Sequence, residues 1–318
     1  MTPAATSTWP VPPAFLEVVR RSDPTLAAWA PGAGEDAAAL ADRWQLTPDG
    51  DPLHGWMAVV WPVVDQHGRR LMLKIAGPDP LGQGEGAALA AWQGRGTVRL
   101  HRRDPEARAV LLDRLDPARD LFDVPIDDAC AVIGDLLADL AGVEPPAGVV
   151  SMADELDDWL VRLDRVPAGQ QVLPTALVDR ARSTIADHVA ELRRPGAHLE
   201  LLHFDLHYLN VLHTSQYATD DASGGWRAID PLPMAGRREW ELIALLRNRW
   251  PDAEAGGDPD RALRRRLDQV CERAGVDRSL ARACAQAAAV DNLLTVLPGN
   301  VDSMFNPPFA VMAQWTDG

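Results

Sequence analysis

Lysine is nearly absent from this chain. Of the 31 Lys and Arg side chains in its 318 residues, one is a lysine, Lys74, and the others are arginines. Cysteine is also scarce, and Cys130, Cys271 and Cys284 have no short paired spacing, which argues against a disulfide framework and against a zinc site.

Positive charge is in deficit as well. The formal net charge is -15 and the sequence pI is about 4.9. Nucleic acids and anionic membranes attract cationic surfaces, so we expect neither as a partner, whereas a cationic small substrate is compatible with the charge. No apolar run reaches the roughly 18 residues of a membrane span, and residues 1–15 lack the pattern of a secretory signal. We expect a cytoplasmic monomer.

The first third of the chain has the texture of a small β-rich lobe with one helix. Residues 1–13 are rich in Pro, Thr and Ala and are expected to form a loose arm. The letters DQHG (65–68) between two apolar, β-rich runs are typical of a hairpin. The expected elements in chain order are short helices within 14–21 and 34–46, strands on either side of 65–68, a helix from Glu85, and two strands about a turn at Asp104 and Pro105.

The rest of the chain is mainly helical, with β-like pieces at its centre. Apolar residues recur at spacings of three and four in 126–143, which indicates a helix, and 152–166, 174–194, 239–250 and further segments toward the end are also expected to be helices. We therefore predict an α+β fold with the bilobal layout of a protein kinase. The predicted parts are an N-terminal nucleotide-binding lobe (1–112), a hinge (113–117) and a helical C-terminal lobe (118–318). The plainer alternative for the hinge is a strand followed by a turn at Pro117.

The stretch LLHFDLHYLNVLH carries the clearest chemical signal. Asp205 is followed five residues later by Asn210, and a second Asp, Asp230, ends the next short apolar run. Phosphoryl transfer needs a carboxylate that orients the attacking hydroxyl and oxygen ligands that hold magnesium. Asp and Asn at this spacing also occur in the catalytic loop of kinases.

The pattern H-x-D-L-H-x-x-N, followed by I-D-P, resembles the aminoglycoside phosphotransferase branch of the kinase-like fold. Together with WRAIDPLPMAG, AAWQGRGTVRLHRRD and VLLDRLDPARDL, it is similar to the aminoglycoside/hydroxyurea antibiotic-resistance kinases, which include streptomycin 6-phosphotransferases. The resemblance implies that Asp205 is the catalytic base and that Asn210 and Asp230 are magnesium ligands. It further implies that His203 supports the loop, and that His207 lies beside the nucleotide phosphates or packs under the loop.

Lys74 ends the strand-like run LMLK, where the kinase template has a lysine that reaches the α- and β-phosphates. Lysine is a compact charge on a flexible stem, whereas arginine is a planar fork that demands other geometry. A lone lysine among arginines therefore indicates a site rather than a solvated surface. We expect Glu85 as its partner, because no other acidic residue lies between Asp79 and Asp104.

The nucleotide-binding elements are otherwise weakly marked. No G-x-G-x-x-G precedes Lys74, and the loop 48–56 takes its place without assignable phosphate contacts. At the hinge, backbone groups near Asp113 and Leu115 are expected to meet the adenine edge of ATP.

The acceptor side is marked by carboxylates, of which we select Asp120, Glu239 and Glu241 as candidate substrate contacts. Carboxylates would attract an aminoglycoside, which carries several cations. The adjacent Arg237 and Arg238 would instead disfavour a cationic sugar, and Arg237 stands where the streptomycin-kinase pattern has Asp. This pair keeps another hydroxylated metabolite possible as the acceptor.

The sequence thus predicts a kinase that uses ATP and Mg²⁺ to phosphorylate a hydroxyl of an aminoglycoside-type, streptomycin-like antibiotic, giving resistance. A kinase of an amino sugar or hydroxyurea is the first alternative, and a catalytically silent nucleotide-binding pseudokinase is the second. A third alternative is a helical metal site, because His203 and His207 are four residues apart on either side of Asp205.

Overall fold

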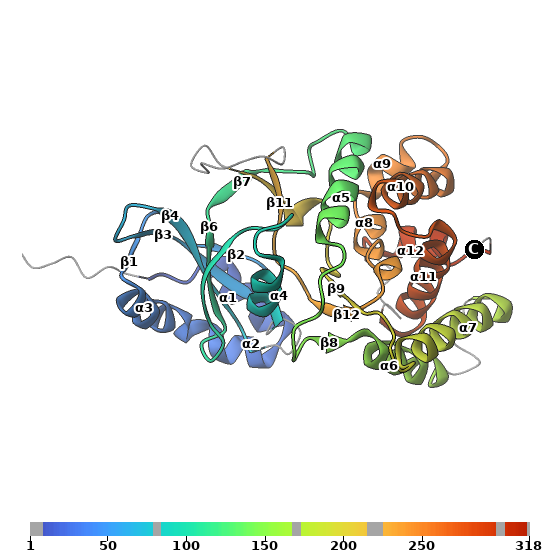
Figure 1. Ribbon diagram of the computed structural model, residues 1–318, viewed down its shortest axis with the longest axis horizontal. Helices are drawn as coiled ribbons and strands as arrows, with labels where there is room; N and C mark the ends of the chain where they lie inside the picture. The colour runs from blue at the N-terminus through green and yellow to red at the C-terminus, as the bar shows by residue number, and fades with distance from the viewer. Residues whose placement is uncertain (1–8, 79–83, 167–172, 215–224, 297–302, 317–318) are drawn as a thin grey trace, which may run out of the picture. The chain divides into compact units, whose positions relative to one another are not determined.

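The computed structural model describes residues 9–78, 84–166, 173–214, 225–296 and 303–316 (Figure 1). The chain folds into two compact units. Unit 1 comprises Met1–Pro117 and His213–Gly225, and unit 2 comprises Ala118–Leu212 and Trp226–Gly318. The lobes and hinge inferred from the sequence stay a prediction. No helix within the described ranges is long and apolar enough to cross a bilayer.

Unit 1 is built on an antiparallel sheet with the strand order β1-β3-β4-β6-β5, and β2 pairs with β3. The strands are β1 (Leu46–Pro48), β2 (Leu53–His54), β3 (Ala58–Asp65), β4 (Arg70–Ala76), β5 (Leu100–Asp104) and β6 (Ala109–Asp113). The hairpin expected at DQHG joins β3 to β4. Its turn is held by Asp65, whose Oδ1 accepts hydrogen bonds from the backbone N–H groups of His67 and Arg69, each at 2.9 Å.

One face of this sheet is covered by the N-terminal helices α1 (Pro13–Ser22), α2 (Pro24–Trp29) and α3 (Ala33–Trp44) (Figure 1). Side chains alternate between the two faces of a strand. The residues of β3 and β4 that pack with these helices are accordingly every second one: Val59, Trp61, Val63, Leu71, Leu73 and Ile75. The intervening residues, Lys74 among them, belong to the opposite face. Helix α4 (Glu85–Trp92) follows β4 in the chain and begins at Glu85, as expected.

Unit 2 is mainly helical. Its helices are α5 (Ile126–Leu140), α6 (Met152–Asp164), α7 (Thr175–Leu192), α8 (Ile243–Arg247), α9 (Trp250–Glu254), α10 (Pro259–Ala274), α11 (Arg278–Asp291) and α12 (Asn306–Met312). A small sheet has the order β8 (Val150–Ser151), β12 (Met234–Gly236), β9 (Glu200–Leu202). A second has the order β11 (Trp226–Ala228), β10 (Val211–Thr214), β7 (Leu115–Asp120).

Two local expectations are wrong. The helix expected over 239–250 is divided into the 3-10 turn η5 (Arg238–Trp240), α8 and α9, because Arg249 has a left-handed backbone (φ 53°) and Pro251 begins a new helix. Pro117, expected at a turn, lies inside strand β7. A proline is tolerated there because β7 is the last strand of its sheet, so its missing N–H leaves no ladder bond unmade on the open side.

Candidate functional site

Lys74 lies in the middle of the unit 1 sheet. It pairs directly with Val60 on β3 and with Val110 on β6, and 7% of its surface is exposed. Directly opposed residues point to the same face of a sheet, so this row continues through Val60 to its partner Leu53 on β2. The face opposite α1–α3 therefore carries one ammonium group in an apolar row.

Glu85 pairs with Lys74 as expected from the sequence. The Lys74 Nζ atom lies 2.8 Å from Glu85 Oε1 and 2.7 Å from Oε2, and both side chains are buried. Glu85 is the first residue of α4, where the helix dipole favours a negative charge. An ammonium ion in this setting is stable only with such a partner, because an uncompensated buried charge costs about 3–5 kcal/mol. The contact of either side chain with a nucleotide stays a prediction.

The residues expected at the hinge are engaged within unit 1. The Asp113 carboxylate lies 2.6 Å from His101 Nε2, and the Asp113 N–H donates to the carbonyl of Arg99 at 3.0 Å. Leu115 is buried. Between them, Arg114 donates to Asp49 Oδ2 at 2.7 Å and so fixes the start of the loop that stands in place of a glycine motif. Adenine contacts at Asp113 and Leu115 stay predictions.

The central loop of unit 2 runs from β9 to β10 and turns sharply at Phe204, which has a left-handed backbone (φ 61°). His203 is completely buried, and its Nε2 lies 3.0 Å from the Ile229 carbonyl, to which it must donate. Burial lowers the pKa of His203 to about 4, although the charges of Asp205 and Asp230 act in the opposite direction. His203 is therefore a neutral imidazole that joins this loop to the segment before Asp230.

Asp205 and Asn210 meet on this loop. The Asn210 Nδ2 atom donates to the Asp205 carbonyl at 2.9 Å and lies 3.2 Å from Asp205 Oδ2. His207 Nδ1 accepts from the Leu209 N–H, so the neutral ring carries its proton on Nε2, 3.6 Å from Asp205 Oδ2. The loop thus presents a partly exposed carboxylate with hydrogen-bond donors around one of its oxygens.

Asp230 is brought to the same region by the strand that follows. The Ile229 N–H donates to the Asn210 carbonyl at 2.9 Å, which joins the residue before Asp230 to the loop. Asp230 itself is exposed and has a left-handed backbone (φ 56°), a conformation that costs energy in most residues other than glycine.

These residues fit a hard cation such as Mg²⁺. The Asn210 amide uses its nitrogen toward Asp205, which leaves its oxygen as the ligand atom, and Asp230 offers an exposed carboxylate. Magnesium favours oxygen ligands and commonly takes few of them from the protein.

The alternative of a helical metal site is wrong. Residues 203–207 do not form a helix, and His203 is committed to the Ile229 carbonyl. Among the residues that the structure describes, no group of three or more His, Cys, Asp or Glu is arranged to hold a metal ion.

Glu241 lies beneath the loop. Its Oε1 accepts a hydrogen bond from the His203 N–H at 2.6 Å, and the carboxylate also accepts from the Phe204 N–H. Only 3% of the residue is exposed, and burial raises its pKa to about 7. In this structure Glu241 supports the turn of the loop. Its expected contact with an acceptor stays a prediction.

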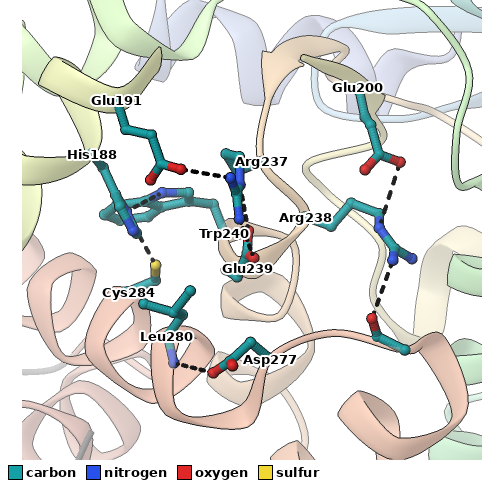
Figure 2. Close-up of polar contacts among 11 residues, drawn as sticks. His188, Glu191, Glu200, Arg237, Arg238, Glu239, Trp240, Asp277, Leu280 and Cys284 are labelled. Atoms are coloured by element: carbon teal, nitrogen blue, oxygen red, sulfur yellow. Dashed lines mark hydrogen bonds and ion pairs between the residues drawn. The ribbon is translucent and has the colours of Figure 1, made fainter. Parts of the chain in front are cut away.

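The residue before Glu241, Trp240, is anchored to two helices of unit 2 (Figure 2). The indole Nε1 of Trp240 donates to His188 Nδ1 on α7 at 3.0 Å. The Sγ atom of Cys284 on α11 lies 3.6 Å from His188 Nδ1. The Trp240 and His188 rings also meet edge to face. The support of the loop is thus built into the helical core of unit 2.

Arg237 and Arg238 each form polar contacts with other residues of unit 2 (Figure 2). Arg237 donates to Glu191 at 2.8 Å and to Glu239 at 3.0 Å, while Arg238 donates to the Ala274 carbonyl at 2.8 Å. Arg238 also lies 3.5 Å from Glu200. Carboxylates thus lie beside both arginines and offset part of their charge, and the effect of the pair on an acceptor stays a prediction.

The remaining acceptor candidates have local partners. Burial acts to raise the pKa of Glu239, but the hydrogen bond from Arg237, a backbone hydrogen bond and the charge of Arg237 together outweigh it, so the pKa ends below its usual value. Asp120 Oδ1 accepts from the Phe122 N–H at 2.8 Å. Both residues stay predictions as acceptor contacts.

Sequence analysis missed one contact of the loop. Arg247 Nη2 donates to Asp205 Oδ1 at 2.7 Å. The two residues are 42 positions apart, and in the letters LLRNRW this arginine resembles any solvated helix cation. No local pattern marks it.

Three comparisons bear on identity. The chain is 35% identical over 291 residues to a streptomycin 6-kinase of Streptomyces glaucescens, which covers 87% of this chain and 91% of the relative. It is 36% identical over 261 residues to a hydroxyurea phosphotransferase of Kitasatospora aureofaciens, which covers 81% of this chain and 71% of the relative. Among solved structures, the macrolide 2'-phosphotransferase MphH of Brachybacterium faecium matches with a TM-score of 0.52 at 17% identity, over 89% of this chain and 99% of that chain.

The structural match confirms the expected α+β, kinase-like fold. Residues 43–293 also match the family model described as aminoglycoside/hydroxyurea antibiotic resistance kinase, which spans both the Lys74–Glu85 pair and the loop of Asp205. The resemblance of the sequence motifs to these enzymes is confirmed as well. The chain therefore belongs to the aminoglycoside/hydroxyurea antibiotic resistance kinase family, whose members are small-molecule kinases.

Proposed function

We propose that this protein transfers the γ-phosphoryl group of ATP to a hydroxyl of an aminoglycoside-type, streptomycin-like antibiotic and thereby gives resistance. The observation that carries the proposal is the Asp205–Asn210 pair on the loop after β9, in a chain of this family. The similarity of this chain to a streptomycin 6-kinase, over most of both chains, favours this acceptor.

In the proposed reaction Asp205 orients the acceptor hydroxyl and takes its proton. The hydroxyl oxygen attacks the γ-phosphorus, a new O–P bond forms, and the bond to the β-phosphate oxygen breaks so that ADP leaves with the electron pair. His203 and Glu241 hold the loop on which Asp205 lies. Catalysis of this kind is mostly positioning and electrostatic stabilisation.

The phosphate charge is shared between two sets of residues. Lys74, held by Glu85, would neutralise charge on the nucleotide phosphates. Asn210 and Asp230 would hold Mg²⁺, which when bound neutralises further phosphate charge. His207, whose Nδ1 accepts from the Leu209 N–H, would donate from Nε2 to an oxygen near Asp205.

A second acceptor has an observation of its own. The similarity to a hydroxyurea phosphotransferase is as high as that to the streptomycin 6-kinase, although over less of the chain. Hydroxyurea is neutral and small, whereas an aminoglycoside is a polycation. An amino sugar is intermediate in size and charge. Because the three acceptors differ in these properties, one assay can show which of them the enzyme phosphorylates.

The test is an acceptor panel. Purified protein is incubated with ATP and Mg²⁺ and with streptomycin, a second aminoglycoside, an amino sugar or hydroxyurea, and products are identified by mass spectrometry. We expect a mass increase of one phosphate on streptomycin. Phosphorylation of hydroxyurea or the amino sugar alone would favour the alternatives. Nucleotide binding without phosphorylation of any acceptor would contradict the proposal and support the pseudokinase.

A further inference from the structure

The carboxylate of Asp205 is held at both of its oxygens. Oδ2 lies 3.2 Å from Asn210 Nδ2, and Oδ1 accepts a hydrogen bond from Arg247 Nη2 at 2.7 Å. Each carboxylate oxygen has two lone pairs, so these bonds still leave acceptor capacity for a substrate hydroxyl. The two contacts together fix the plane of the carboxylate, which one contact alone would leave able to rotate.

Arg247 is restrained in turn. Its guanidinium carbon lies 5.4 Å from the centroid of the Phe305 ring, a cation–π contact that limits the orientations of the planar fork. About a third of the arginine side chain is exposed, compared with 19% for Asp205. The guanidinium therefore meets the carboxylate at a partly exposed site, with the Phe305 ring beside it.

A short helical segment places Arg247 next to Asp205. Helix α8 begins two residues after Glu241, which holds the His203 N–H, and Arg247 is the last residue of that helix. The left-handed backbone at Arg249 ends the helical run just beyond it. One segment thus ties the loop at two points, the turn at His203 and the carboxylate of Asp205.

The ion pair contributes little to folding. Pairs of partly exposed side chains stabilise proteins by about 0.2–1 kcal/mol. Orientation is a different matter, because a misplacement of about 1 Å at a reacting group can cost on the order of 100-fold in rate. We therefore expect loss of the Arg247–Asp205 contact to change the rate of catalysis more than the stability of the fold.

We propose that Arg247 is a positioning residue for the transfer reaction. It orients the Asp205 carboxylate toward the acceptor hydroxyl, and Phe305 keeps the guanidinium in place. This inference rests on the proposed function, in which Asp205 accepts the hydroxyl proton.

The test compares Arg247→Gln and Arg247→Lys with a matched control. Arg264 has the same kinds of contact, an ion pair with Asp260 at 2.9 Å and a cation–π contact with Trp315 at 4.8 Å, but it lies on α10 and not on the segment that supports the loop. We expect Arg247→Gln to lower kcat by about 10- to 100-fold with an unchanged KM for ATP. Arg247→Lys, which keeps the charge, should recover part of the loss, and Arg264→Gln should stay near wild type.

Failure of the inference and failure of the proposed function give different results. An active wild type whose Arg247→Gln variant keeps kcat within about threefold, or loses no more than Arg264→Gln, overturns the inference alone. A wild type that phosphorylates no acceptor overturns both. If Arg247→Gln does not fold, Arg247→Lys decides: a reduced kcat with an unchanged KM supports the role, and an unchanged kcat contradicts it.

Discussion

At the scale of single residues, the retained lysine is explained by its surroundings. Lys74 is buried and meets both oxygens of Glu85, within a row of apolar side chains on the face of the sheet opposite α1–α3. A compact ammonium fits that space, and the larger guanidinium of an arginine would have to displace neighbours or the carboxylate.

The variant Lys74→Arg tests this explanation. We expect it to keep the charge and the fold, to lower kcat/KM for ATP by about 10- to 100-fold, and to destabilise the protein by about 1–3 kcal/mol through overpacking. Steady-state kinetics and urea unfolding measure the two effects. Arg70→Lys, at an exposed position on the same strand, is the control and should change neither quantity. Retention of more than a third of the wild-type kcat/KM would refute the phosphate role.

Residues differ in how far the sequence could predict them. The Lys74–Glu85 pair was predictable because one partner is unique in composition and the other is the sole acidic residue in its segment. The bond between Arg247 and Asp205 was not, because arginine is common in this chain and the pair depends on where α8 ends. The neutralisation of Arg237 by Glu191 was equally hidden, since it joins α7 to the residue before η5.

At the scale of elements, the segment from η5 to α8 acts as the support of the catalytic loop. Its central residue, Glu241, keeps a raised pKa of about 7 because it is buried. Between the ordinary pKa of 4.5 and about 7, the folded protein holds a proton on Glu241 that the unfolded chain has released. Stability from this group therefore falls as the pH rises through that window.

The variant Glu241→Gln tests the pH effect. Its amide oxygen can still accept from the His203 and Phe204 N–H groups, but it does not titrate. Between about pH 4.5 and 8 we expect the wild type to lose up to about 3 kcal/mol of unfolding free energy relative to the variant. Denaturant unfolding at several pH values gives the difference. Parallel pH profiles for the two proteins would show that Glu241 ionises normally.

Elements with local signals were predicted and those fixed by tertiary contacts were not. The hairpin of β3 and β4 follows from Asp65 and its turn, which involve neighbouring residues only. The short strands β1 and β2 were missed because two or three residues carry no periodicity, and their pairing with β3 creates them. The expected helix over 239–250 was wrong because its helical pattern continues across Arg249, where the backbone turns left-handed.

At the scale of the whole molecule, each unit carries one part of the proposed chemistry. Unit 1 holds the Lys74–Glu85 pair, and unit 2 holds Asp205, Asn210 and Asp230. The kinase-like fold was predictable from the order of β-rich and helical segments together with one motif. The acceptor was not, because the candidate carboxylates Glu239 and Glu241 have structural partners that the sequence does not reveal.

The overall charge bears on the acceptor as well. A net charge of -15 attracts a polycation at long range, and carboxylates offset part of the charge of Arg237 and Arg238. Both observations are compatible with the aminoglycoside acceptor that we propose.

The central claim is that Asp205 is the base of a phosphoryl transfer, and the rate of streptomycin phosphorylation by Asp205→Asn tests it most directly. Asp135→Asn, at an exposed ion pair in the same unit, is the matched control. We predict that Asp205→Asn lowers kcat by about 100-fold or more while the affinity for ATP, measured by calorimetry, stays within about threefold. A variant that keeps more than a tenth of the wild-type kcat would contradict the account.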